Sequence, residues 1–229
     1  MVLGPRAAGA DRRVAREAGA MSEAVVEFFF SYRSPYSYLA AARVFALADR
    51  WRLRVQYRGV APMVNRGVAL PRAKKLYLLR DAAREARRLG IPFGPVHDPL
   101  GEGAERCLAI GELAAELGRA REFVTLSARA IWSQAADVSR PRVLRTLCQA
   151  AGLDWRQCEQ ALAEPRWLAR CERNAECLRA AGHWGVPTML FDGEPFWGQD
   201  RIEDLEARLA AAGVPATEPK AAAAPGVSV

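Results

Sequence analysis

Two serines, Ser34 and Ser37, follow an apolar run at residues 28–30, where a buried segment gives way to a helix. Ser34 precedes Pro35, and a hydroxyl residue followed by proline is a common way for a helix to begin. Backbone N–H groups point out of a helix start, and the helix dipole adds partial positive charge there. The junction is therefore predicted to stabilise an anion, and a thiolate is one such anion.

The chain has no thiol of its own at this junction. Its cysteines are odd in number, form no Cys-x-x-Cys motif and mostly fall in predicted helices, where a free cysteine behaves as a small apolar residue. They are Cys107, Cys148, Cys158, Cys171 and Cys177. With two histidines in the chain, no spacing suits a metal site, and none is expected. Free thiols suit a reducing cytosol, so we expect a cytoplasmic protein.

The formal net charge is +7, which raises the question of a nucleic-acid partner. Acidic and basic residues are interleaved through most helical segments, and no run of Lys and Arg alternates with aromatic residues, so we expect no nucleic acid. A positive field that attracts small anionic substrates is the better interpretation. The longest apolar runs are far shorter than the ~20 residues that span a bilayer, so no membrane association is expected.

The hydrophobic pattern predicts a strand at 25–31, a helix at 35–51 and a strand at 53–59, which together form a right-handed βαβ unit. From 71 to 181 it predicts only helices. A strand at 188–191, a turn, a second short strand and a helix at 201–212 complete the chain. This order, βαβ…ββα around a helical stretch, predicts an α/β, thioredoxin-like fold with a large all-α insertion.

The predicted boundaries are a disordered extension at 1–22, a thioredoxin-like domain at 24–60 plus 184–213, a helical insertion at 61–183 and a disordered tail at 214–229. The first helix of the insertion is expected to bury one apolar stripe. Its members are Leu76, Leu79, Ala83, Ala86 and Leu89.

Five segments, at 34–39, 75–81, 89–93, 184–188 and 196–201, carry a resemblance to a known family. In sequence and order they are similar to the 2-hydroxychromene-2-carboxylate isomerases and the kappa-class glutathione transferases, within the DsbA-like group. In DsbA-like oxidoreductases the positions of Ser34 and Ser37 are the two cysteines of the redox motif. The resemblance implies that glutathione brings the sulfur as a cofactor, and that the protein is a homodimer.

The resemblance also implies roles for individual residues. Ser34 is expected to be catalytic by hydrogen bonding the thiolate, the alternative being a helix cap alone. Pro187 is expected to be cis, with the backbone of Val186 pairing with the bound tripeptide. Asp200 is expected to bind the γ-glutamyl ammonium or to cap the last helix, and Gln199 to hold the carboxylate of the same end.

Further expected contacts lie outside these motifs or at their edges. Lys75, or its neighbour Lys74, and Asn65 are expected to contact glutathione. Substrate contacts are expected from Tyr32, Arg33, Arg80, Arg84 and Trp197.

The predicted activity is that of a glutathione-dependent isomerase, which adds the thiolate reversibly to an unsaturated aromatic α-keto acid. The partner is then a small aromatic carboxylate or another electrophile. Two alternatives stay open: a kappa-like transferase that conjugates glutathione to electrophiles, and a glutathione-binding module without catalysis.

Overall fold

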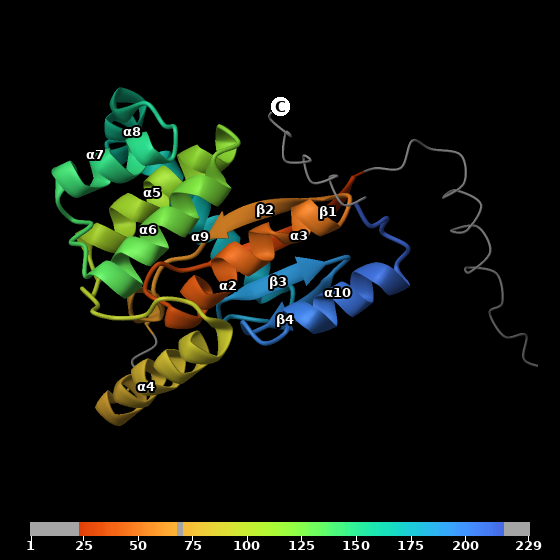
Figure 1. The fold of residues 1–229 in the computed structure, drawn as a ribbon. Coiled ribbons are helices and arrows are strands. Elements are labelled where there is room, and N and C mark those ends of the chain that lie inside the picture. Colours follow the sequence, from red (N-terminus) through yellow and green to blue (C-terminus); the bar gives the residue numbers. More distant parts are fainter. Residues whose placement is uncertain (1–22, 68–70, 218–229) are drawn as a thin grey trace, which may run out of the picture.

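The computed structural model describes residues 23–67 and 71–217 of the 229-residue chain. Its centre is a four-stranded sheet in the order β2-β1-β3-β4 (Figure 1). β1 pairs with β2 in parallel and with β3 antiparallel, and β3 and β4 form an antiparallel hairpin. The strands are β1 (Ala24–Phe30), β2 (Leu53–Gly59), β3 (Thr188–Phe191) and β4 (Glu194–Trp197). The expected α/β, thioredoxin-like fold is confirmed.

The helix predicted at 35–51 is two helices, α2 (Pro35–Phe45) and α3 (Leu47–Arg50). The break lies at Ala46, whose N–H donates to the carbonyls of both Ala42 and Val44 and closes the last turn of α2. Leu47, the first residue of α3, is completely buried.

The insertion between β2 and β3 is helical, as predicted. Figure 1 shows helices α5 to α8 grouped at one end of the sheet, while α4 stands apart below them. The remaining elements are η1 (Met63–Arg66), α4 (Arg72–Leu89), α5 (Glu102–Glu116), α6 (Ala120–Gln134), α7 (Pro141–Ala150), α8 (Trp155–Leu162), α9 (Pro165–Ala180) and α10 (Ile202–Ala211). None of these described helices is both long enough and apolar enough to cross a membrane.

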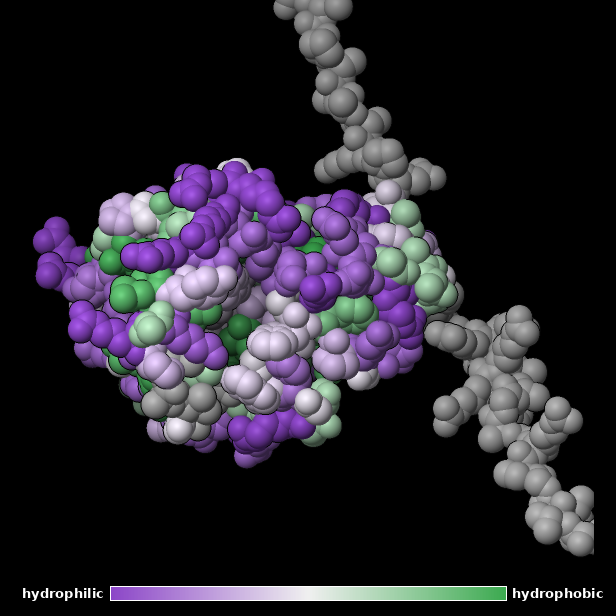
Figure 2. Space-filling view, turned by 90° about the horizontal axis from the view of Figure 1, so that it is seen from below, coloured by the Kyte–Doolittle hydropathy of each residue, from purple (hydrophilic) through white to green (hydrophobic). Residues whose placement is uncertain are grey.

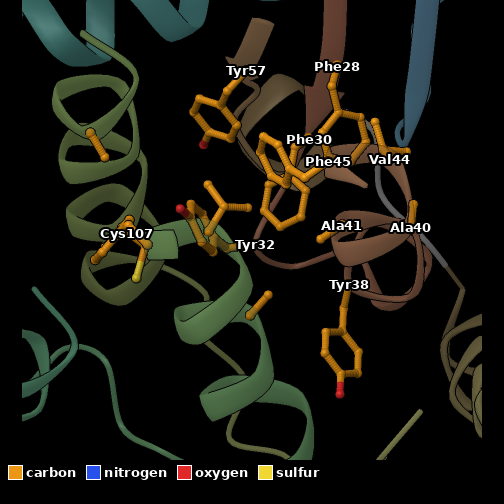
Figure 3. Close-up of a cluster of buried hydrophobic side chains, with 14 of the residues drawn as sticks. Phe28, Phe30, Tyr32, Tyr38, Ala40, Ala41, Val44, Phe45, Tyr57 and Cys107 are labelled. Atoms are coloured by element: carbon orange, nitrogen blue, oxygen red, sulfur yellow. The ribbon is translucent and has the colours of Figure 1, made fainter. Parts of the chain in front are cut away.

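The sheet and the insertion share one hydrophobic core. Phe28 and Phe30 from β1 meet Phe45 and Tyr57 in edge-on or tilted ring contacts, which Figure 3 shows in close-up. Gly111 lets α5 approach this core closely, because a Cβ there would lie 2.8 Å from the Tyr57 hydroxyl. The insertion is therefore packed onto the sheet rather than attached to it by a linker.

The buried face of α4 differs from the predicted stripe. Ala82 and Ala86 are fully buried, whereas Leu76 is 51% and Leu79 40% exposed. The small side chains face α2, the element with which α4 is in main contact. The small alanine side chains allow α4 to approach α2 closely. This close approach, and not burial of the largest apolar residues, determines how the helix packs.

The tail predicted to be disordered from 214 begins with ordered residues, so that prediction was wrong there. Arg52 N–H donates to the Pro215 carbonyl at 2.8 Å, and Thr217 N–H donates to the Arg50 carbonyl at 2.8 Å. The backbone hydrogen bonds compensate for a composition that has few apolar side chains to bury. The predictions for residues 1–22 and 218–229 fall outside the described residues.

Candidate active site

A half-open pocket of about 760 Å³ lies at the start of α2, between α4, η1 and the loops on either side of the β3–β4 hairpin. Figure 2 looks at the molecule from the side of α4, where pale and green residues are set in a largely hydrophilic surface. Seven of the predicted site residues line this pocket. They are Arg33, Ser34, Val186, Pro187, Trp197, Gln199 and Asp200.

Ser34 is the N-cap of α2. Its Oγ accepts the Ser37 N–H at 3.1 Å and lies 3.4 Å from the Val186 carbonyl, to which it can donate. Pro35 has no N–H, so the first free donor of the helix is the backbone N–H of Tyr36, which has no acceptor among the described residues. The capping role predicted for Ser34 is confirmed, and the pocket opens directly at the positive end of the helix.

The Val186–Pro187 peptide bond is cis, as the resemblance implied. The Pro187 carbonyl accepts the Gly198 N–H at 3.0 Å, which fixes the loop before β3 to the loop after β4. The Val186 N–H has no acceptor among the described residues. Its carbonyl faces Ser34, so both backbone groups of Val186 are placed to pair with an extended ligand.

Gln199 is buried and is hydrogen bonded at both ends of its amide. Arg43 donates to its Oε1 at 2.8 Å and to its backbone carbonyl at 2.7 Å, while its Nε2 donates to Glu85 at 2.9 Å. This chain of bonds joins α2, the loop after β4 and α4. Gln199 therefore supports the wall of the pocket through internal partners.

Asp200 lies at the rim in an ion pair with Arg201, at 3.0 Å. The alternative role as a cap of α10 was wrong, because that helix begins after Arg201 and has no side-chain cap. Gly198, with φ of +120°, makes the turn possible, since a Cβ there would lie 2.4 Å from Asp200 Oδ1. The Asp200 carboxylate stays accessible from the pocket.

One face of α4 lines the pocket, and of its residues the sequence had indicated only Lys74, as the alternative to Lys75. Tyr36 Oη donates to Asp81 Oδ2 at 2.5 Å, which fastens α4 to α2. Burial, with the neighbouring carboxylate, raises the pKa of Tyr36 well above its ordinary range, so the phenol stays a donor. The residues of this face are Lys74, Leu78, Asp81, Glu85 and Arg88. Their spacing of four and three is a signal that could have identified them.

Lys74 and Arg33 both place a positive charge in the pocket, but only Arg33 is in an ion pair with a described residue. Arg33 forms a two-point ion pair with Asp98, with both distances at 2.8 Å. Hydrogen bonding by Arg33 also keeps the pKa of the Asp98 carboxyl below its usual value. Lys74 forms no ion pair with any described residue, so it is the better candidate to receive a ligand carboxylate.

Tyr32 does not reach the pocket, so its predicted substrate contact was wrong. Its side chain is fully buried, with the ring centroid 4.9 Å from that of Phe30, and Figure 3 shows it among the core residues. Tyr32 continues the alternation of Phe28 and Phe30 past the end of β1, and that face of the strand is the core face.

Four other predicted contacts lie outside the pocket lining: Asn65, Lys75, Arg80 and Arg84. All four are exposed. Lys75 is turned about 100° around α4 from Lys74, and Arg80 and Arg84 lie on the other flank of the same helix. From η1 the pocket receives Met63 and Val64 instead of Asn65.

Aromatic rings form one rim of the pocket. Trp197, 53% exposed, has its ring centroid 4.6 Å from that of His183 and 6.3 Å from that of Trp184. Trp184 is a lining residue that the sequence reasoning missed. The described residues contain no cluster of three side chains that could hold a metal ion.

The mixed sheet, the capped start of α2 and the facing cis proline define a thioredoxin-like protein with a helical insertion. The chain belongs to the family of DSBA-like thioredoxin domains, whose model matches residues 25–210.

Curated relatives agree with this assignment. The 2-hydroxychromene-2-carboxylate isomerase of Sphingobium xenophagum is 27% identical over 196 residues, which cover 80% of this chain and 97% of the relative. Human glutathione S-transferase kappa 1 is 25% identical over 203 residues, 79% of this chain and 88% of its own. A solved 2-hydroxychromene-2-carboxylate isomerase structure superposes with a TM-score of 0.70 at 24% identity, covering 82% of this chain and 96% of its own, which supports the fold.

Proposed function

We propose that this protein is a glutathione-dependent isomerase of the 2-hydroxychromene-2-carboxylate isomerase type. The observation that carries the proposal is Ser34, a hydroxyl at the start of α2 opposite the cis Val186–Pro187 bond, where DsbA-like oxidoreductases have a cysteine. The named relatives include such isomerases and a glutathione transferase, which supports glutathione chemistry at family level.

The donors in the pocket fit glutathione. The backbone N–H groups of Tyr36 and Val186 lack acceptors among the described residues, and the Ser34 hydroxyl adds a third donor. The exposed Asp200 carboxylate supplies an acceptor for an ammonium group. A volume of about 760 Å³ falls within the usual range for small-molecule sites, and leaves space for a second ligand beside the tripeptide.

When bound, glutathione supplies a thiolate that adds reversibly to an unsaturated carbon of the substrate. Ser34 turns its proton from the Val186 carbonyl toward the sulfur, and the Val186 carbonyl then accepts from the ligand backbone. The N–H of Tyr36 and the dipole of α2 favour the ionised thiol. Because Ser34 has no sulfur, the enzyme cannot be trapped as a mixed disulfide with glutathione.

The substrate in this proposal is an aromatic carboxylate with a conjugated double bond. Lys74 lies without an ion-pair partner among the described residues and receives the carboxylate. Trp197 and Trp184 provide the flat apolar surface on which an aromatic ring stacks. A homodimer and a cytoplasmic location belong to the same proposal, and sedimentation and cell fractionation test them.

Calorimetry with glutathione, followed by the thiolate absorbance of the bound cofactor, tests the proposal. We expect Ser34→Ala to raise the pKa of bound glutathione and to lower turnover about 100-fold. Thr146→Ala, at an exposed threonine outside the pocket lining whose hydroxyl donates to the Arg142 carbonyl, serves as the control. No binding at millimolar glutathione would overturn the proposal.

The alternative is a kappa-like transferase, which the human relative's name favours. Product analysis separates the two activities, because an isomerase returns its glutathione and a transferase consumes it. Binding without turnover of any unsaturated carboxylate or electrophile would indicate the silent binding module instead.

A further inference from the structure

β2 is an edge strand, and one side of it carries no neighbouring strand among the described residues. The Val60 N–H donates to the Phe30 carbonyl at 2.8 Å, continuing the ladder with β1. Backbone groups of successive residues point to opposite sides of a strand. Even-numbered residues of β2 therefore face β1, and the N–H and C=O groups of Val55, Tyr57 and Gly59 face outward.

At Gly59 the outward groups are satisfied by two buried side chains. Glu112 Oε1 accepts the Gly59 N–H at 2.7 Å, and Asn174 Nδ2 donates to the Gly59 carbonyl at 3.0 Å. For Val55 and Tyr57 no backbone or side-chain partner occurs among the described residues. The edge is thus capped at one end and open along the preceding residues.

The open edge faces a groove of about 810 Å³. Every β2 residue from Leu53 to Arg58 lines it, with α5 and α9 on one flank and residues of α3 and α6 on the other. It shares no lining residue with the pocket at the start of α2. Six residues of extended chain span about 20 Å, so the groove matches a short strand.

Arginines outnumber carboxylates along the groove. The lining holds Arg54, Arg58, Arg121, Arg170 and Arg173, against Glu23, Glu112 and Glu116. Four of these arginines already form ion pairs, Arg58 and Arg121 with carboxylates outside the lining. Arg173 is the one that has no ion-pair partner among the described residues. Burial raises the pKa of Glu112 to about 7, which reduces its negative charge at neutral pH. An occupant with acidic side chains complements this surface.

The chain's own segments suit the groove poorly. The extension at 1–22 contains four arginines and two acidic residues, so it carries the same sign of charge as the groove. Antiparallel pairing with β2 of a second copy through Val55 and Tyr57 would set Arg54 opposite Arg58. Like charges opposite each other on paired strands are destabilising.

We propose that the outer edge of β2 binds an extended acidic segment of a partner polypeptide by strand addition. The Val55 and Tyr57 backbone groups continue the sheet into the partner, and the groove arginines select its acidic side chains. This site is independent of glutathione.

The probe is a fluorescein-labelled hexapeptide of alternating Glu and Val, titrated into the full chain by fluorescence anisotropy. Its controls are the alternating Lys and Val peptide, and the Glu-Val peptide N-methylated at alternate residues. We expect the Lys-Val and N-methylated peptides to bind at least about 10-fold more weakly. Hydrogen exchange of the Val55 and Tyr57 amides should slow about 10-fold in the complex with the Glu-Val peptide.

Two variants of the protein separate backbone pairing from charge. Val55→Pro removes an outward N–H while leaving the ladder to β1, which uses the even-numbered residues. Arg173→Glu reverses one charge and leaves the backbone intact. Both should weaken binding of the Glu-Val peptide, by about 10-fold and about 5-fold respectively.

Four results would overturn the proposal. They are no binding of the Glu-Val peptide at millimolar concentration, equal binding of its N-methylated form, equal binding of the Lys-Val peptide, and slow exchange of the Val55 and Tyr57 amides in the protein alone. If slow exchange of these amides in the protein alone depended on protein concentration, the occupant of the groove would be a second copy of the chain. If it did not depend on concentration, the occupant would be a segment of the same chain. The N-methylated peptide needs no protein variant, so the test stands even if Val55→Pro does not fold.

Discussion

Two polar clusters join the helical insertion to the thioredoxin-like part of the fold, and they differ in their access to water. The buried seam consists of Gly59, Glu112 and Asn174, where side chains of α5 and α9 satisfy the end of β2. The pocket cluster consists of Tyr36, Asp81, Glu85 and Gln199, which ties α4 to α2. The Glu112 side chain is 3% exposed, whereas the Glu85 side chain is 25% exposed.

This difference in exposure indicates that the two clusters have different roles. A hydrogen bond sheltered from water is costly to leave unmade, so the seam should carry stability. Bonds at a water-filled pocket are easily exchanged for bonds to solvent, so the pocket cluster should govern ligand binding and the position of α4.

The largest effect is expected from Glu112→Ala. It leaves the Gly59 N–H and the Asn174 amide without their acceptor and opens a cavity in α5. We expect the free energy of unfolding to fall by about 4 kcal/mol, measured by urea denaturation. Glutathione binding per folded molecule should be unchanged. If the free energy of unfolding fell by less than about 1 kcal/mol, water would have replaced the carboxylate, and the seam would not be sheltered from solvent.

The same carboxyl should make stability depend on pH. Burial raises the pKa of Glu112 from 4.5 to about 7, so the folded state keeps a proton that the unfolded state releases. Its stabilisation is fully present below about pH 4.5 and is lost as the pH rises to about 7. Between these values we expect the unfolding free energy of the wild type to fall by about 3 kcal/mol relative to that of Glu112→Gln. Parallel profiles of the two proteins would contradict the assignment.

The sequence predicted the sheet and the start of α2 because those signals are local. The alternation through Phe28 and Phe30 and the Ser34-Pro35 pair each lie within a few residues of what they determine. The seam gave no such signal. Glu112 meets Gly59 and Asn174, which are 53 and 62 residues away, so its partners depend on the tertiary structure.

Part of the pocket lining could be predicted from local motifs, and part of it depends on how α4 packs in the tertiary structure. The loops around Pro187 and Gly198 belong to motifs of the family, and their residues came together as expected. For α4 the apolar pattern predicts a buried face that includes Leu76 and Leu79, but both side chains are exposed. Ala82 and Ala86 face α2 instead, which turns Lys74 toward the pocket and Lys75 away from it.

A moderate effect is expected from Tyr36→Phe in the pocket cluster. The change removes the hydrogen bond to Asp81 and retains the ring. We expect a loss of about 1 kcal/mol in unfolding free energy, with faster hydrogen exchange confined to α4. Tyr77→Phe, on an exposed tyrosine of the same helix outside the pocket lining, is the control. Equal exchange in both variants would show that other contacts position α4.

The smallest effect is expected from Lys74→Met, with Lys75→Met as its matched control. Both changes remove one positive charge from adjacent positions of α4, but only Lys74 lines the pocket. We expect Lys74→Met to raise KM for a carboxylate substrate about 5-fold, with kcat nearly unchanged, because an exposed charge contributes about 1 kcal/mol. Lys75→Met should leave both constants unchanged. If the two variants raised KM equally, the effect would come from the overall field of the protein rather than from a carboxylate contact, and Lys74 would lose its proposed role.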